Sequence, residues 1–187
     1  KVINSSSLNI EKHKININCG FQNNIREERT EAIAHGYMPK PDGTLDRKYL
    51  QNTYTFDAQD EIKISSKHTL TIGGNVEHQN NSIDGWGFLI PSYTRFTAGI
   101  YAFDKYEISK ELFLNAGIRY DVGNTKIDDY FDWYPSVTIS GISYIQRASS
   151  SHLNFDNISA VIGASYIKKN TNLKINIGKS FRMPLAN

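Results

Sequence analysis

The sequence has only one cysteine, Cys19, so no disulfide can form within its 187 residues. A lone thiol has no second cysteine for a metal or redox pair, and we expect Cys19 to act as a small hydrophobic residue. An excess of charge of one sign is also missing, because 21 basic and 19 acidic residues leave a net charge of +2. Without a basic run, no nucleic-acid partner is predicted.

Long apolar runs are absent as well. A membrane-spanning helix needs about 18 consecutive apolar residues, and the longest stretches here are short, such as 98–103. This excludes a helical membrane protein but leaves open a transmembrane β-barrel, whose strands alternate apolar and polar residues. The sequence starts at Lys1 without a methionine or signal peptide. We therefore expect it to be an internal piece of a longer, exported chain.

The residues that are present favour β-structure. Hydrophobic residues make up 39% of the chain, below the usual share of about 45–50% in globular domains. Aromatic residues are abundant, with 11 Tyr, 9 Phe and 2 Trp, and Asn, Ser, Thr and Gly are common. These residue types are weak helix formers, and the mixture suits many strands that each have one polar face.

A period of two recurs along the whole chain and predicts strands. In residues 112–122, for example, Leu114 and Ile118 share one face and Arg119 and Asp121 share the other. Seven segments follow this pattern: residues 14–22, 49–64, 69–79, 95–108, 112–122, 158–168 and 173–182. Acidic residues interrupt the apolar face of two of them, Asp60 in the second and Asp104 in the fourth. A β-bulge in either strand would shift the register and remove the conflict.

Strand length and connection length both favour a membrane barrel. Several segments have ten or more residues, whereas a strand tilted across a bilayer needs about 9–11 and an average soluble strand has about 5–6. The connections alternate between short and long, as in outer-membrane barrels with tight periplasmic turns and long outer loops. Short connections are expected at 65–67, 109–111 and 169–171, and long ones at 30–48, 80–94 and 124–156. The polar stretch Asn4–Ser7 is expected to form the turn before the first strand.

The two faces should meet different surroundings. Arginine at mid-membrane costs about 2–4 kcal/mol on the lipid side of a barrel, so the apolar face should contact outer-membrane lipid and the polar face the interior. Arg119, Asp121, Lys174 and Arg182 then point inward. They are expected mainly to pair across strands or to contact whatever fills the barrel, with a direct ligand contact as the alternative.

Aromatic side chains gather near the long connections. Those at strand ends suit the membrane–water interface, where a ring can be half solvated, whereas those within loops are free to bind a ligand. The sequence does not decide between these roles. The predicted ligand-binding residues are Trp86, Tyr93, Arg119, Tyr130, Trp133 and Tyr134.

Catalytic and metal motifs are not found. None of the five histidines has zinc-site spacing, and a loop site using His35 and His152 is only a minor alternative. There is no nucleophile elbow, phosphate-binding loop or dinucleotide fingerprint. We predict no enzyme activity, no metal and no cofactor.

Four segments resemble TonB-dependent receptors of the outer membrane. Leu112–Asp121 reads LFLNAGIRYD and is similar to the recurrent family strand that ends in Gly-hydrophobic-Arg-Tyr-Asp. Gly178–Pro184 (GKSFRMP) resembles a later strand in which Gly, Phe, Arg and Pro recur, and Ala98–Ile108 resembles the strand before the first motif. Ile90–Tyr93 is similar to loops of Bacteroidetes-type receptors. The resemblance extends from about Lys14 to the end of the sequence.

The resemblance implies a piece of a barrel of about 22 strands, filled by a plug domain that this sequence lacks. Residues 1–187 are therefore predicted to be a partial barrel domain in a bacterial outer membrane. The family imports scarce nutrients with energy from the TonB complex, which acts through the plug, and a ferric siderophore or similar iron complex is the expected ligand. The alternatives are a structural or adhesive barrel without transport, an outer-membrane enzyme, and, as a different fold, a soluble lipocalin-like barrel.

Overall fold

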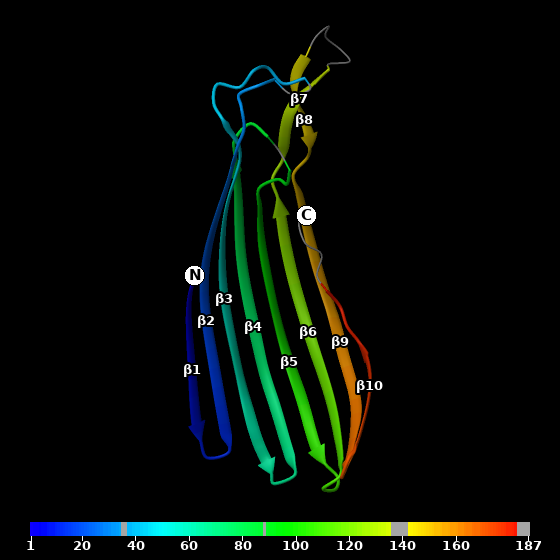
Figure 1. The fold of residues 1–187 in the computed structure, drawn as a ribbon. Helices are drawn as coiled ribbons and strands as arrows, with labels where there is room; N and C mark the ends of the chain where they lie inside the picture. The colour runs from blue at the N-terminus through cyan, green and yellow to red at the C-terminus, as the bar shows by residue number, and fades with distance from the viewer. Residues whose placement is uncertain (35–36, 88, 136–141, 183–187) are drawn as a thin grey trace.

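The chain folds into an antiparallel meander of long strands (Figure 1). The computed structural model describes residues 1–34, 37–87, 89–135 and 142–182, without the side chains of 134, 135, 142 and 143. Within these ranges, no helix is long and apolar enough to cross a membrane. The strands are β1 (Val2–Ile10), β2 (His13–Arg29), β3 (Leu45–Ser65), β4 (His68–Asp84), β5 (Tyr93–Glu107), β6 (Leu112–Ile127), β7 (Tyr130–Pro135), β8 (Ile142–Ala148), β9 (Ser151–Lys168) and β10 (Thr171–Lys179).

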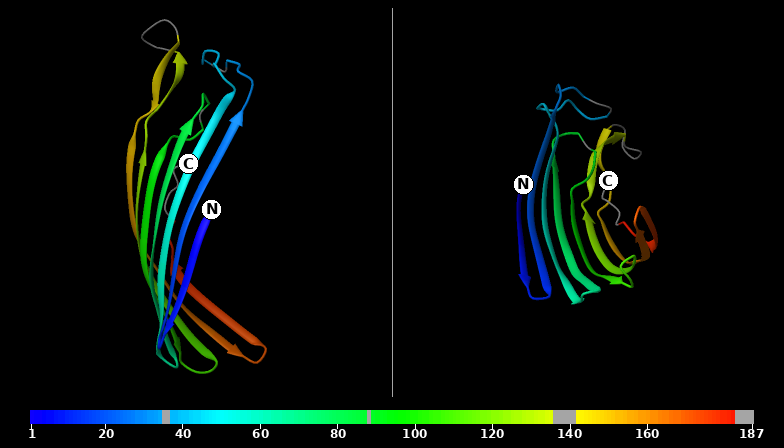
Figure 2. Two further views of the ribbon diagram at one scale, coloured as in Figure 1. Left: turned by 90° about the vertical axis from the view of Figure 1, so that its left-hand side faces the viewer. Right: turned by 60° about the horizontal axis from the view of Figure 1, so that its bottom comes forward.

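Eight of these strands form one sheet in the order β1-β2-β3-β4-β5-β6-β9-β10, and β7 and β8 form a separate hairpin beyond its end. The sheet is curved (Figure 2) and, in the part of the chain described, it is open between β1 and β10. The predicted all-β, antiparallel segment of a barrel is thus confirmed. All seven predicted strands are present, and β1, β7 and β8 are additional.

Short and long connections lie at opposite ends of the sheet, as predicted (Figures 1 and 2). Tight turns join β1 to β2, β3 to β4, β5 to β6 and β9 to β10. Two of these turns contain a residue with positive φ, Glu11 at 50° and Lys169 at 48°. The long connections are residues 30–44, residues 85–92 and the segment from β6 to β9 that carries the β7–β8 hairpin.

One turn prediction is wrong. Asn4–Ser7 lies inside β1, where Asn4 pairs with Cys19 and Ser7 pairs with Asn16 of β2, and the tight turn follows at Glu11–Lys12. Serine and asparagine occupy both faces of this strand, so the alternation that marks the other strands is missing. Pairing of the backbone with β2 forms the strand despite its polar side chains.

The strands are tilted in the manner of a barrel wall. The row of paired residues that starts at His13 of β2 runs across the sheet and reaches Ile162 of β9 five strands later. Ile162 lies six residues before Lys168, where β9 ends at its own tight turn. Relative to this row of paired residues, the tight turns are therefore displaced by about one residue from each strand to the next. Strands that are tilted to a barrel axis require such a stagger.

The apolar face of the sheet is open to its surroundings. Ile100 is 67% exposed and Ile162 is 64% exposed, and neither a second sheet nor a helix covers this face in the described ranges. Along β6 the residues of the polar face are the less accessible ones. On the apolar face of β5, Phe96 and Tyr106 are separated by ten residues. At about 3.3 Å per residue and a tilt of about 40°, they bracket a band about 25 Å tall, the height of the apolar band of outer-membrane barrels.

The two acidic residues on the apolar face are accommodated without the bulges considered from the sequence. Pairing runs unbroken past Asp60 and Asp104, and the register shift in the β3–β4 pair comes later, between Lys63 and Ser65. Each carboxylate instead contacts a histidine of the neighbouring strand. Nδ1 of His13 lies 2.6 Å from Oδ2 of Asp60, and Nε2 of His68 lies 2.6 Å from Oδ1 of Asp104.

On the polar face, glycines leave gaps through which long side chains cross one strand to reach the next. The Tyr101 hydroxyl passes Gly73 and hydrogen-bonds to Oε1 of Gln59 at 2.9 Å. Similarly, Arg119 passes Gly99: its Nη2 donates to Oδ1 of Asn75 at 2.6 Å and its Nε donates to Asp121 at 2.8 Å.

A Cβ on Gly73 would lie 2.6 Å from the Tyr101 hydroxyl, and one on Gly99 would lie 2.2 Å from Nη2 of Arg119. A side chain at either position would clash with the side chain that crosses it, so both glycines are required by close packing. The predicted cross-strand pairing of the inward-facing Arg119 is confirmed by its hydrogen bond to Asn75 of β4.

Candidate functional site

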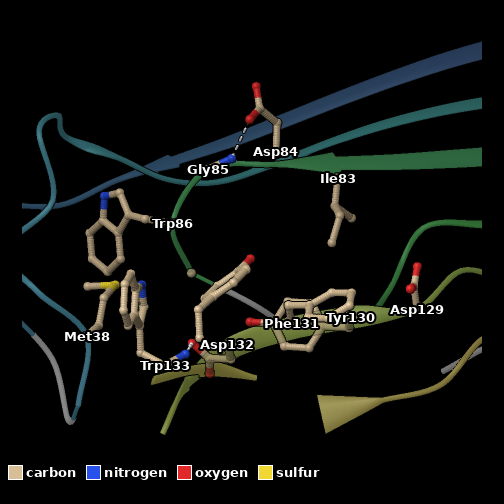
Figure 3. A pocket seen from close by; sticks show the side chains of 12 residues that line it. Met38, Ile83, Asp84, Gly85, Trp86, Asp129, Tyr130, Phe131, Asp132 and Trp133 are labelled. Atoms are coloured by element: carbon tan, nitrogen blue, oxygen red, sulfur yellow. Dashed lines mark hydrogen bonds between the residues drawn. The ribbon is translucent and has the colours of Figure 1, made fainter. Parts of the chain in front are cut away.

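The candidate site is a cavity of about 370 Å³ at the long-loop end of the molecule (Figure 3). Three connections that are distant in sequence contribute to it: the β2–β3 loop, the β4–β5 loop and the β7–β8 hairpin. The cavity falls within the range of about 300–1,000 Å³ that is usual for ligand pockets. The lining residues are Met38, Ile83, Asp84, Gly85, Trp86, Gly87, Asp129, Tyr130, Phe131, Asp132, Trp133 and Tyr144.

Backbone contacts hold the β4–β5 loop in place. The amide of Gly87 donates to the carbonyl oxygen of Asp46 at 2.7 Å, and Nε1 of Trp86 donates to the carbonyl oxygen of Gly43 at 3.1 Å. Gly85 has a φ of +100°, and a Cβ at this position would lie 2.4 Å from the carbonyl oxygen of Asp46. Only glycine adopts this conformation without strain, so the sequence fixes the path of the chain into the cavity.

Aromatic rings form one wall of the cavity. Phe131 and Tyr144, from the two strands of the hairpin, stack with ring centroids 5.9 Å apart, and Trp133 lies 5.3 Å from Tyr144. Met38 and Trp86, from the other two connections, line the same cavity as Trp133 (Figure 3). A ligand here would meet aromatic faces and a thioether, which favour apolar, aromatic or cationic groups.

The charged side chains of the described lining are all negative. The lining includes three aspartates, Asp84, Asp129 and Asp132, and no Lys, Arg or His among the described residues. Asp84 accepts a hydrogen bond from the Gly85 amide at 2.8 Å, and Asp132 accepts one from the Trp133 amide at 2.7 Å.

Burial, followed by the nearby negative charge of Asp132, raises the pKa of Tyr130 to about 12. The Tyr130 phenol therefore remains neutral in the cavity at physiological pH.

The structure brings three of the six predicted ligand-binding residues together. Trp86, Tyr130 and Trp133 all line the cavity. Tyr93 lies on the polar face of the sheet and is 8% exposed, and its hydroxyl bridges Gln51 and Gln79.

The remaining two predicted residues are placed differently. Arg119 is in the interior network described above, away from the cavity. The backbone of Tyr134 pairs with Ser143 within the hairpin, and its side chain is outside the described part.

Sequence reasoning missed nine of the twelve described lining residues. Phe131 and Tyr144 belong to the same aromatic-rich segment as Trp133, so aromatic density alone could have suggested them. No sequence signal indicates Met38 or the three aspartates, because their place in the cavity depends on how separate loops meet.

Metal-site chemistry is not seen in the ranges described, where no group of three His, Cys, Asp or Glu side chains could hold an ion. His35, one half of the alternative metal pair, lies outside those ranges, and His152 lies 2.5 Å from Nδ2 of Asn124.

Comparison with known proteins agrees with the geometry. The family described as "TonB dependent receptor-like, beta-barrel" matches residues 80–187, more than half of the chain. No curated protein sequence matches the chain. The family consists of outer-membrane receptors that transport ligands, and the curved antiparallel sheet with its apolar outer face has the form of such a barrel wall. The chain belongs to the TonB-dependent receptor-like β-barrel family.

Proposed function

We propose that this chain forms part of the wall and outer ligand site of an importer that takes up a scarce nutrient across a bacterial outer membrane. The observation that carries the proposal is the cavity between three long connections at one end of the sheet. Beneath it lies the polar face of the sheet, which lines a protected interior when the barrel is closed. Ligand captured at the cavity is therefore positioned to enter the barrel.

The proposed cargo is a ferric siderophore or a similar iron complex. The cavity has room for part of such a ligand, and its aromatic wall supplies the apolar contact area that small-molecule sites use. In this proposal, residues 1–187 belong to the barrel domain, and a plug elsewhere in the polypeptide connects the ligand site to the TonB complex. The apolar face, with Ile100 and Ile162 exposed, contacts membrane lipid.

Growth of a deletion strain tests the function. Cells that lack the gene should fail to grow when iron is available only as the cognate ferric complex, and the full-length gene should restore growth and uptake of labelled iron. Parallel cultures on haem, cobalamin and glycans identify the nutrient if it is not an iron complex. Normal growth of the deletion strain on every one of these sources would contradict import and would favour a structural or adhesive barrel.

A variant tests the role of the cavity. The double variant Trp86→Ala/Trp133→Ala removes aromatic contact area from the cavity. We expect its apparent affinity for the cargo to fall by at least tenfold. The matched control is Leu89→Ala, which truncates a 62% exposed side chain in the same β4–β5 loop. Leu89 itself does not line the cavity. Equal uptake by the two variants, at equal amounts of protein in the outer membrane, would place the ligand site elsewhere.

A further inference from the structure

The charge of the cavity limits what can bind there. Its described lining holds three carboxylates and no basic side chain, although the chain as a whole has a small positive net charge. The charge of Arg147 on β8 lowers the pKa of Tyr130. This effect is smaller than each of the three that raise the pKa, which are burial and the charges of Asp132 and Tyr144. The cavity therefore combines a negative electrostatic potential with its aromatic wall.

This potential discriminates between classes of ferric complex. Three singly charged hydroxamate groups neutralise Fe³⁺, so a ferric tris-hydroxamate is uncharged, or cationic if its backbone carries an amine. Three doubly charged catecholates leave a strongly anionic complex. An anion in this cavity would lie beside like charges in a partly desolvated site, which costs binding free energy, whereas a cation would be attracted by the carboxylates and the aromatic faces.

We infer that the group seated between Trp86, Trp133 and the three aspartates is neutral or positively charged, so that the protein selects uncharged or cationic ferric complexes over anionic ones. The inference rests on the proposed function, because it specifies the cargo of the same site. The inference predicts that ferric complexes with the same iron content bind differently according to their net charge. A neutral complex gains from the aromatic wall alone, and a cationic complex gains further from the carboxylates.

Equilibrium binding of labelled complexes tests this selectivity. Outer membranes from cells that make the full-length protein, and from the deletion strain, are incubated with a neutral tris-hydroxamate, a cationic amine derivative of it, or an anionic tris-catecholate. We expect the neutral complex to bind at least tenfold more tightly than the catecholate. The cationic derivative should bind severalfold more tightly than the neutral one at low salt, with the advantage shrinking as salt rises.

Neutralising the carboxylates should change the ranking. In Asp129→Asn/Asp132→Asn, binding of the cationic complex should fall about tenfold, that of the neutral complex should hold, and that of the catecholate should improve. The asparagine at position 132 keeps an oxygen that can accept the Trp133 amide. The single change Asp129→Asn provides a milder second variant, and Asp42→Asn is the matched control, with the same change of charge on another connection outside the lining.

The outcomes separate the inference from the proposed function. If the catecholate binds as tightly as the hydroxamate, or if the aspartate variants leave the ranking unchanged, the charge selectivity is refuted while iron import stands. If none of the complexes binds above the level of the deletion strain, iron import itself fails and the inference falls with it.

Discussion

Gly73→Ala is the sharpest test of how the barrel wall is built. Gly73 lies on the polar face of β4, and the Tyr101 ring crosses it from β5 to reach Gln59 on β3. An added Cβ would lie 2.6 Å from the Tyr101 hydroxyl oxygen, 2.7 Å from its Cζ and 2.9 Å from the carbonyl oxygen of Ala58. The first two contacts involve a rigid ring and the third involves backbone, so the ring must leave its place.

The expected cost follows from three contributions. Losing the Tyr101–Gln59 hydrogen bond costs about 1 kcal/mol, and forcing a methyl group into a filled site costs about 1–3 kcal/mol. Against these, alanine in a strand is more favourable than glycine by about 0.5–1 kcal/mol. The net destabilisation is about 1–3.5 kcal/mol. Displacement of the ring would also disturb its contact with Arg119, whose Cζ lies 5.8 Å from the ring centroid.

The assay is urea unfolding of the full-length protein in lipid vesicles, followed by circular dichroism. Gly43→Ala is the matched control, because a Cβ at Gly43 would have no neighbour within 4 Å. Combining Gly73→Ala with Tyr101→Leu should recover part of the loss, since the smaller side chain no longer crosses β4. The packing argument is refuted if Gly73→Ala unfolds at the same urea concentration as Gly43→Ala, or if the second substitution gives no recovery.

Three further predictions concern the membrane face, the loop and the cavity. Ile100→Arg places a charge on the apolar face and should cost about 2–4 kcal/mol, whereas Thr97→Arg on the polar face of the same strand should assemble normally; equal amounts of both in the outer membrane would contradict the assignment of faces. Gly85→Ala should strain the β4–β5 loop by about 1–3 kcal/mol and weaken cargo binding without unfolding the barrel, which binding and circular dichroism together would show. Tyr130 should ionise near pH 12 in the folded protein, against about 10 when unfolded, so its contribution to stability is complete below pH 10 and is lost as pH rises toward 12. The tyrosinate absorbance of wild type minus that of Tyr130→Phe should show this transition, and a difference that titrates near pH 10 would refute it.

Sequence periodicity predicted the membrane part of the fold well because the environment there imposes it. Lipid on one side and a polar interior on the other force alternate residues to differ, and all seven segments with that pattern are strands. Where a strand continues beyond the bilayer the constraint ends. Residues 23–29 of β2 are mostly polar on both faces, so the strand is longer than its pattern suggested. The β7–β8 hairpin likewise lies beyond the end of the main sheet, whereas β1 pairs with residues 13–21 of β2 and was concealed by serine and asparagine on both of its faces.

The candidate site was harder to predict because it depends on contacts between loops. Trp86 and Trp133 could be chosen from residue type and position in long connections, but nothing near Met38 in the sequence indicates that it lines the same cavity. The place of Tyr93, in contrast, could have been predicted from the period of its strand. Tyr93 alternates in step with Arg95 and Thr97, which places it on the polar face, where its hydroxyl bridges two glutamines.

The two aspartates on the apolar face show what a pattern in one strand cannot reveal. The pattern of each single strand favours a shift of register at Asp60 and Asp104. Each aspartate is instead matched by a histidine that begins a neighbouring strand directly after a tight turn, His13 in β2 and His68 in β4. In both cases the histidine is the diagonal neighbour of the aspartate, because His13 pairs with Ile62 and His68 pairs with Tyr106, each two residues from the acid. An isolated carboxylate facing lipid would be costly, and a hydrogen-bonded partner near the turn end lowers that cost. The same arrangement occurs twice, so a polar residue on the lipid face should be judged against the diagonal position of the next strand before its register is questioned.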